Sequence, residues 1–391
     1  MITPFTADGR VDYEALGRMI DYVIEGGADY IVALGTTAET PTLYIQERAV
    51  VAMFIANQIR HRVPLVIGVG GNSTSEVLDQ LREFDLRGAD AILSVTPYYN
   101  KPSQEGLYQH FKVVSEHSPL PIILYNIAGR TGVNMTAETT LRIAADFPNV
   151  IGIKEASGNI GQIQEIIDRR REGFLVLSGD DGIAVDVMRR GGDGVISVAV
   201  NAFPRRFMAC IDLAKRGDFD AAETAFAPMH EVVEALFAEG NPTGVKCALS
   251  ILGLIGSRLR LPLVAGTPAG VDPYIRFTLK RRFPKKSTHY ETTSHPVAAA
   301  AAAVGCEGSR GERHQGPHRR SGLGTVLSEP PAALRAGRLD PHGRRLPLPL
   351  LRLRLPAAVP PVGDEPRTRP FLRNARTAER RRTRRHRPAG R

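Results

Sequence analysis

Short runs of apolar, often β-branched residues recur at regular spacing through the first half of the chain. Continuous apolar runs are typical of parallel strands that helices cover on both faces, whereas half-exposed strands alternate polar and apolar residues. We expect strands at residues 30–34, 65–69, 91–95, 121–125, 150–154, 174–177 and 194–198.

Segments with helical periodicity separate these runs, at residues 12–25, 46–60, 75–87, 104–116, 138–146 and 160–171. Such alternation predicts a (β/α)₈ TIM barrel. Its first strand belongs immediately before Thr3, where only two residues stand, so we expect that strand to be truncated. An open doubly wound sheet is the alternative, and it is weaker because no Gly-x-Gly-x-x-Gly fingerprint follows an early strand.

Three helical segments follow the last predicted strand, at residues 205–215, 219–237 and 245–256. The sequence therefore predicts a barrel catalytic domain at residues 1–204 and a small C-terminal helical domain at residues 205–284. A low-complexity tail rich in arginine and proline follows at residues 285–391.

The net charge of +10 is distributed unevenly between these parts. Residues 1–284 contain 28 Lys+Arg and 33 Asp+Glu, whereas residues 285–391 contain 23 and 8. Apolar content in the tail is too low to offset the entropy lost on ordering its backbone.

Three interpretations of the tail stay open: translation out of frame after a reading-frame error near residue 283, intrinsic disorder, or a nucleic-acid-binding module that neutralises phosphates. We favour the frame error, because nearly all-arginine basic content with abundant proline, alanine and glycine is typical of GC-rich DNA read in the wrong frame. Nucleic-acid binding is the weakest interpretation, because few aromatic residues are present to stack on bases.

Composition excludes several classes of protein. Three cysteines without paired spacing do not make a disulfide scaffold or a zinc ribbon. We find no apolar run long enough to span a membrane and no export signal at the N-terminus, so we expect a cytoplasmic protein without membrane contact. Metal-ligand spacing and a Gly-x-Ser-x-Gly elbow are also missing, which argues against a metallohydrolase and an α/β-hydrolase.

Lys154 stands out among the residues at the carboxyl ends of the predicted strands, where barrel enzymes carry their chemistry. It alone among the six lysines before residue 285 ends an apolar strand. Alternation places it on the face of Val150 and Gly152, opposite Ile153. Burial favours a neutral amine, which can attack a keto group to form a Schiff base. The alternative is a structural lysine paired with a carboxylate.

Other residues at these strand ends have structural alternatives too. Tyr99 and Tyr125 are also explained as ordinary rim aromatics, and Arg130 as a solvated loop charge. Thr36 and Thr37 are also explained as caps of the following helix. A further set of glycines, Gly68, Gly70 and Gly71, is compatible with a phosphate cradle or with a tight strand-to-helix turn.

Together these motifs resemble the dihydrodipicolinate synthase family, within the superfamily of pyruvate-dependent Schiff-base aldolases. The resemblance extends from about residue 2 to residue 280. It rests on Gly35-Thr-Thr, Thr96-Pro-Tyr-Tyr-Asn, Tyr125…Arg130-Thr-Gly, Gly152-Ile-Lys-Glu-Ala and Asn241-Pro, in the family's order and near-family spacing.

The resemblance implies condensation of pyruvate with L-aspartate 4-semialdehyde to give 4-hydroxy-tetrahydrodipicolinate, in lysine and diaminopimelate biosynthesis. It implies a covalent pyruvate imine on Lys154, no metal or dissociable cofactor, and a homo-oligomer that is a tetramer built as a dimer of dimers. The implied roles are Lys154 as imine-forming residue, Tyr125 as general acid/base, Thr36 and Tyr99 as its proton relay, Thr37 and Arg130 as carboxylate ligands, and Gly179 and Ile196 as pocket lining. Tyr99 would come from the neighbouring subunit.

Two points within this resemblance stay open. Sialic-acid lyases and ketodeoxy sugar-acid aldolases share the lysine and the tyrosine, and they are the alternative; Arg130 beside the Thr36-Thr37 pair favours the synthase. Asn72, Glu76 and Tyr98 match the site at which lysine inhibits some family members. Arg48 would place a cation beside a cationic effector, so we expect weak inhibition by lysine.

Overall fold

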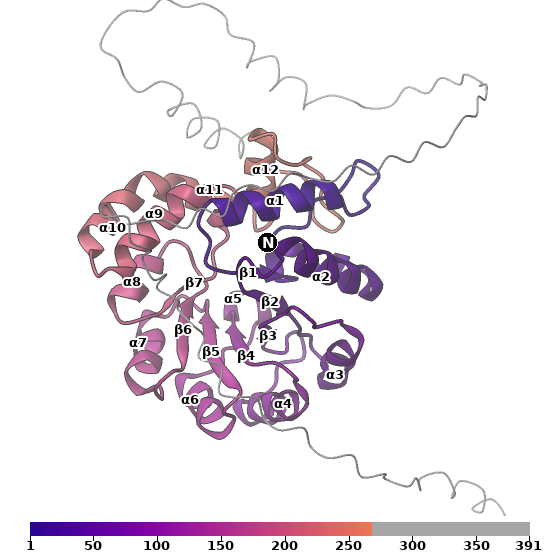
Figure 1. The fold of residues 1–391 in the computed structure, drawn as a ribbon. Helices are drawn as coiled ribbons and strands as arrows, with labels where there is room; N and C mark the ends of the chain where they lie inside the picture. The colour runs from indigo at the N-terminus through magenta and orange to yellow at the C-terminus, as the bar shows by residue number, and fades with distance from the viewer. Residues whose placement is uncertain (268–391) are drawn as a thin grey trace, which may run out of the picture. The chain divides into compact units, whose positions relative to one another are not determined.

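Seven parallel strands, each paired with its neighbours in the sequence, form the sheet at the centre of the structure (Figure 1). This structure is a computed structural model, and it describes residues 1–267. The strands are β1 (Ile31–Ala33), β2 (Leu65–Gly68), β3 (Ala91–Val95), β4 (Ile122–Asn126), β5 (Val150–Glu155), β6 (Leu175–Ser178) and β7 (Gly194–Val195). All seven lie where the apolar runs predict them.

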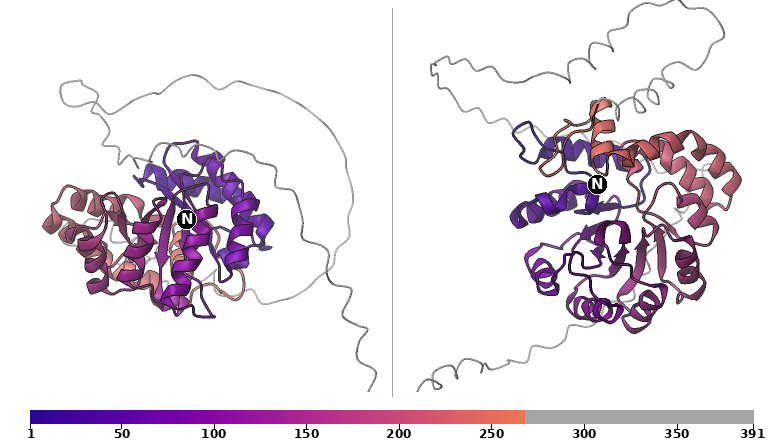
Figure 2. Two further views of the ribbon diagram at one scale, coloured as in Figure 1. Left: turned by 90° about the horizontal axis from the view of Figure 1, so that it is seen from below. Right: turned by 180° about the vertical axis from the view of Figure 1, so that it is seen from behind.

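Helices connect consecutive strands and surround the sheet, as both views in Figure 2 also show. They are α1 (Tyr13–Glu25), α2 (Ile45–Ile59), α3 (Thr74–Glu83), α4 (Gln104–His117), α5 (Ala128–Thr131), α6 (Ala137–Asp146), α7 (Ile160–Arg169) and α8 (Ala184–Arg189). After β7 come α9 (Pro204–Lys215), α10 (Phe219–Phe226), α11 (His230–Ala238) and α12 (Thr243–Ile251). Short 3₁₀ helices occur at η1 (Thr36–Ala38), η2 (Thr40–Thr42), η3 (Ala199–Asn201) and η4 (Ala227–Met229).

The sheet curls into a TIM-barrel-like arrangement, which confirms the predicted fold class. Met1 and Ile2 lie between β1, at one edge of the sheet, and the segment that follows β7, at the other edge. The amino group of Met1 donates to the carbonyl of Val32 in β1 at 2.8 Å, and the Ile2 N–H donates to Asn201 Oδ1 in η3 at 3.0 Å. These bonds connect β1 with the segment that follows β7.

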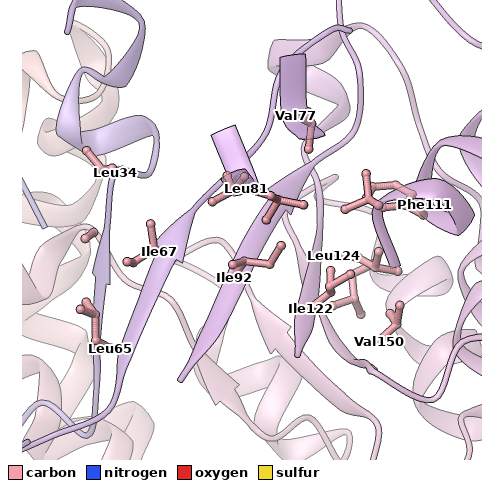
Figure 3. Close-up of a cluster of buried hydrophobic side chains, with 14 of the residues drawn as sticks. Leu34, Leu65, Ile67, Val77, Leu81, Ile92, Phe111, Ile122, Leu124 and Val150 are labelled. Atoms are coloured by element: carbon pink, nitrogen blue, oxygen red, sulfur yellow. The ribbon is translucent and has the colours of Figure 1, made fainter. Parts of the chain in front are cut away.

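One hydrophobic cluster fills the space between the strands and the helices outside them. Figure 3 shows part of it, with Ile67, Ile92 and Leu124 on the strands and Leu81 and Phe111 on the surrounding helices. All five side chains are buried. Burying such side chains is the main stabilising contribution to a fold of this kind.

A second cluster joins the C-terminal helices to α1. Met19 of α1, Phe207 of α9 and Leu249 of α12 are fully buried members. The C-terminal helices thus share a core with the beginning of the chain, and α12 is drawn beside α1 in Figure 1. The first of these helices, α9, begins at Pro204. The predicted tail at residues 285–391 lies outside the described residues.

Two sequence-based expectations are wrong in detail. The predicted helix at residues 219–237 is interrupted by η4, which contains Pro228, because proline lacks the N–H that a continuous helix needs. Val150 belongs to the outer cluster together with Ile153, not to the face of Lys154. The reason is a register shift between β4 and β5: Ile122 pairs with Val150, but the next residue of β4 pairs with Gly152.

Candidate active site

Lys154 and Tyr125 lie side by side at the carboxyl ends of adjacent strands. They are paired in the register of β4 and β5, and the Lys154 Nζ lies 4.2 Å from the centroid of the Tyr125 ring. Both side chains are buried, with exposed fractions of 9% and 5%. Residues at the same register of neighbouring parallel strands point to the same face, so the sheet itself brings the amine and the phenol together.

The loop after β1 brings two threonines to this pair. The Thr36 Oγ1 and the Tyr125 Oη lie 3.4 Å apart, and the Thr37 Oγ1 accepts a hydrogen bond from the Asn241 Nδ2 at 2.9 Å. Neither threonine caps η1, whose N-cap is Gly35 without a side-chain bond. The helix-cap explanation of the Thr36-Thr37 pair is therefore wrong.

Arg130 lies in the short helix α5, directly after β4, and its side chain is exposed. One guanidinium nitrogen donates to the backbone carbonyl of Asn241 at 3.3 Å. Gly132 ends the helix with a φ of +70°, a left-handed conformation that glycine adopts without strain. The guanidinium keeps donors that Asn241 does not occupy, so it is able to bind a carboxylate.

A buried polar network holds this loop against the strands. The Asn126 Nδ2 donates to the Glu155 carboxylate at 2.9 Å and to Asn134 at 2.8 Å, while its Oδ1 accepts from the Met135 N–H at 3.0 Å. Gln162 of α7 donates to the same carboxylate at 3.0 Å. Glu155 and Asn126 are fully buried. Their satisfied hydrogen bonds fix the chain on either side of Lys154 and Tyr125.

Gly179 follows β6 and packs against the lysine. Its N–H donates to the Glu155 carbonyl at 2.7 Å, and a Cβ at this position would lie 2.5 Å from the Ala156 Cβ and 3.0 Å from the Lys154 Cε. Only glycine fits there. Ile196, the other predicted lining residue, is buried, and its N–H donates to Ser178 at 2.9 Å.

Asp181 adds a buried carboxyl group near this end of the sheet. Burial raises its pKa to about 6, although its carboxylate accepts hydrogen bonds from the N–H groups of Val198 and Ala199 at 3.0 and 2.8 Å. These bonds fix the segment immediately after Ile196.

Tyr99 is not brought together with the other predicted residues within one subunit. Its side chain is 83% exposed, its φ is +72°, and within residues 1–267 it makes no hydrogen bond to Thr36 or Tyr125. Tyr98 beside it is 38% exposed. The predicted role of Tyr99 in a neighbouring subunit stays a prediction.

Two of the three residues predicted to bind lysine, Glu76 and Tyr98, lie near Arg48. Glu76 is in the first turn of α3, and a Cβ on Gly71, next to the exposed Asn72, would lie 3.9 Å from its carboxylate. Burial lowers the pKa of the Arg48 guanidinium, whereas Tyr98 and Glu76 act in the opposite direction. Arg48 is thus near enough to interact with both of these residues.

Sequence reasoning missed Glu39 and Lys246, which form a fully buried ion pair. The one sequence signal is a lysine in an apolar helical segment, between Val245 and Ala248; it indicates a buried charge but does not identify the partner. The phosphate-cradle interpretation of Gly68 is unnecessary, because a Cβ there would lie 2.1 Å from the carbonyl oxygen of Leu34. Close backbone packing accounts for this glycine.

Within the described part of the chain, no group of His, Cys, Asp and Glu side chains is arranged to hold a metal ion. None of the helices in residues 1–267 is both long and apolar enough to cross a membrane.

Comparison with known proteins identifies relatives along most of this part of the chain. The family model described as "Dihydrodipicolinate synthetase family" matches residues 1–269. A 4-hydroxy-tetrahydrodipicolinate synthase from Parabacteroides distasonis is 54% identical over 264 residues, covering 68% of this chain and 89% of the relative. One from Neisseria meningitidis serogroup B is 46% identical over 280 residues, covering 72% and 96%.

Solved structures of similar proteins have the same fold. The crystal structure of dihydrodipicolinate synthase from Aquifex aeolicus matches with a TM-score of 0.70 and 40% identity, covering 73% of this chain and 98% of that one. The enzyme from Acinetobacter baumannii, solved as a complex with pyruvate, matches with a TM-score of 0.69 and 40% identity, covering 71% and 96%.

Proposed function

The chain belongs to the dihydrodipicolinate synthetase family, and we propose that Lys154 is the residue on which its reaction takes place. Its activity is that of a 4-hydroxy-tetrahydrodipicolinate synthase, a lyase of lysine and diaminopimelate biosynthesis. The substrates are pyruvate and L-aspartate 4-semialdehyde. The observation that supports Lys154 most directly is its position against Tyr125, with Thr36 within reach of the same phenol.

The proposed chemistry begins at the lysine amine. The Lys154 nitrogen attacks the keto carbon of pyruvate, water leaves, and an imine forms. Loss of a proton from the pyruvate methyl group gives an enamine, whose carbon attacks the aldehyde of the second substrate. The amino group of that substrate then displaces Lys154 and closes the ring. The imine serves as the electron sink, so this route needs no metal and no dissociable cofactor.

Tyr125 acts as the general acid and base in this proposal. Its hydroxyl protonates the oxygen that leaves as water and accepts the proton of the methyl group. The contact of 3.4 Å to the Thr36 hydroxyl supports a relay that returns protons to Tyr125.

Substrate carboxylates bind to Thr37 and Arg130 in this scheme. The Thr37 hydroxyl donates to the pyruvate carboxylate, and the Arg130 guanidinium makes two parallel hydrogen bonds with that of the semialdehyde. Gly179 leaves the space for the Lys154 side chain that imine formation requires. Ile196 supplies an apolar wall.

We propose a homotetramer, arranged as a dimer of dimers, in which the neighbouring subunit supplies Tyr99 to the relay. Large apolar side chains are exposed at Tyr99 and, on α2 and its N-cap, at Tyr44, Val50 and Met53. Their exposure supports subunit contacts, because burying apolar surface is favourable. Sedimentation measures the oligomeric state as the protein is diluted, and specific activity is assayed at the same concentrations. Specific activity is expected to fall as subunits separate, and a fully active monomer would contradict the proposal. A cytoplasmic location stays a proposal, which cell fractionation would test.

A direct assay tests the proposed function. The purified protein is supplied with pyruvate and L-aspartate 4-semialdehyde, and in parallel with N-acetylneuraminate or 2-keto-3-deoxygluconate. Turnover is expected only with the first pair, and Lys154→Ala is expected to abolish it. Cleavage of a sugar acid without condensation of the semialdehyde would overturn the assignment. The names of the curated relatives favour the synthase.

A further inference from the structure

The turn before α12 and the first turns of that helix contact the loop that carries Thr36 and Thr37. The Asn241 Nδ2 donates to the Thr37 Oγ1 at 2.9 Å, and the Lys246 ammonium forms an ion pair with the Glu39 carboxylate. These partners are about 200 residues apart in the sequence. Two separate contacts therefore join the C-terminal helical segment to one loop at the mouth of the barrel.

The hydrogen bond from Asn241 determines which way the Thr37 hydroxyl can donate. Asn241 is 8% exposed, so water does not replace the bond readily. A hydroxyl oxygen that accepts from an amide keeps its own proton free to donate in another direction. Asn241 thus directs the hydroxyl proton of Thr37 toward a separate acceptor.

The ion pair fixes the end of the same loop. Glu39 has a φ of +56°, a conformation that non-glycine residues seldom adopt, and it is fully buried. Its carboxylate also accepts from the Arg260 N–H at 3.0 Å. Lys246 donates in addition to the Arg258 carbonyl at 3.1 Å and lies 4.1 Å from the centroid of the Phe5 ring. A fully desolvated pair with these supporting contacts holds one geometry, unlike a surface ion pair.

We propose that residues 241–246 set the affinity for pyruvate, with Asn241 and Lys246 acting as positioning residues for the loop that carries Thr37. This inference rests on the proposed function, in which Thr37 binds the pyruvate carboxylate. It assigns to the helical segment after the barrel a part in substrate binding.

Asn241→Ala provides the sharper test, because it separates the two substrates. Arg130 donates to the backbone carbonyl of Asn241, which the substitution keeps. The KM for pyruvate is expected to rise about fivefold, the value of one net hydrogen bond, while the KM for the semialdehyde stays within twofold. The fraction of enzyme trapped by borohydride at increasing pyruvate concentration measures the same affinity without turnover.

Combining Asn241→Ala with Thr37→Val tests whether Asn241 acts on pyruvate affinity through the Thr37 hydroxyl. If Asn241 acts through the Thr37 hydroxyl, the double variant is expected to have the pyruvate KM of Thr37→Val alone. Additive effects in the double variant would overturn the positioning role.

The ion pair is tested by Glu39→Gln together with Lys246→Met, which removes both charges and leaves no unpaired buried ion. Pyruvate KM is expected to rise at least threefold in this variant. Asp218→Ala is the matched control: Asp218 caps α10 in the same helical segment through the Ala221 N–H, far along the chain from Asn241. It is expected to lower the melting temperature and leave both KM values unchanged.

The outcomes are distinguishable from a failure of the proposed function. If the wild-type protein traps no pyruvate on Lys154, the proposed function fails whatever Asn241 does. If the wild type traps pyruvate normally, an unchanged pyruvate KM in Asn241→Ala overturns this inference alone. An equal rise for both substrates also overturns it, because that result indicates general loosening.

Discussion

Substituting Gly179 by alanine tests how tightly the site confines Lys154. The added Cβ would lie 2.5 Å from the Ala156 Cβ, 3.0 Å from the Lys154 Cε and 3.2 Å from the Glu155 carbonyl oxygen. Carbon atoms in contact prefer separations of about 3.5–4.0 Å, so relief needs a displacement of roughly 1 Å. Neither methyl group can rotate away, because each is fixed to the backbone.

The backbone resists this displacement. Gly179 donates to Glu155 at 2.7 Å, and the Ala156 N–H donates to Asn126 at 2.8 Å, so the ends of β4, β5 and β6 move together or lose these bonds. Overpacking of this kind costs about 1–3 kcal/mol of unfolding free energy. A shift of about 1 Å at a reacting group can cost about 100-fold in rate. We expect kcat to fall about 100-fold in Gly179→Ala, with slower imine formation.

Steady-state kinetics, the rate of borohydride trapping and denaturant unfolding measure these effects. The control is Gly17→Ala in α1, where the nearest atom to a Cβ is the Phe54 Cζ at an ordinary 3.6 Å. Its free energy of unfolding is expected to rise by about 0.5–1 kcal/mol, because alanine has a higher helix propensity than glycine, and its activity is expected to stay unchanged. If Gly179→Ala instead keeps wild-type kcat and trapping rate, the claim that the lysine is confined here is refuted.

Three further predictions concern regulation, pH and the tail. Lysine is expected to inhibit weakly, because Arg48 already lies near Glu76; half-inhibition below about 1 mM, which needs roughly 4 kcal/mol of binding free energy, would contradict this in an inhibition assay. Burial raises the pKa of Asp181 from 3.8 to about 6, so the folded state binds more protons than the unfolded state between these values, and the contribution of Asp181 to stability falls as pH rises through that window. The free energy of unfolding of Asp181→Asn, measured against pH, is expected to lack this pH dependence, which amounts to about 3 kcal/mol at most. Identical pH profiles for the wild type and the variant would contradict the prediction. Deleting residues 285–391 is expected to leave kcat unchanged, because every residue of the proposed site precedes them; loss of turnover would show that the tail belongs to the enzyme.

The pairing of Lys154 with Tyr125 was predictable because it depends on consecutive parallel strands. Each residue ends an apolar run, and neighbouring strands that run the same way place their carboxyl ends at one edge. The position of Val150 was not predictable, because a register shift between two strands leaves no mark in the hydrophobic pattern. The interruption near Pro228 was readable from the residue itself.

Contacts between remote segments lie beyond this kind of reasoning. The bond from Asn241 to Thr37 and the pair of Glu39 with Lys246 depend on how the C-terminal helices pack against the barrel. Periodicity predicts that these helices exist, but not which of their polar residues face the loop after β1. Tyr99 is different again, because its predicted partner atoms belong to another subunit.

The central claim is that Lys154 forms the covalent intermediate, and borohydride reduction in the presence of pyruvate tests it most directly. The reduced adduct is located by mass spectrometry of the digested protein. Added mass of one reduced pyruvyl group is expected on the peptide that contains Lys154, and none is expected in Lys154→Ala. An adduct on another lysine, or no adduct from a protein that still condenses both substrates, would contradict the account.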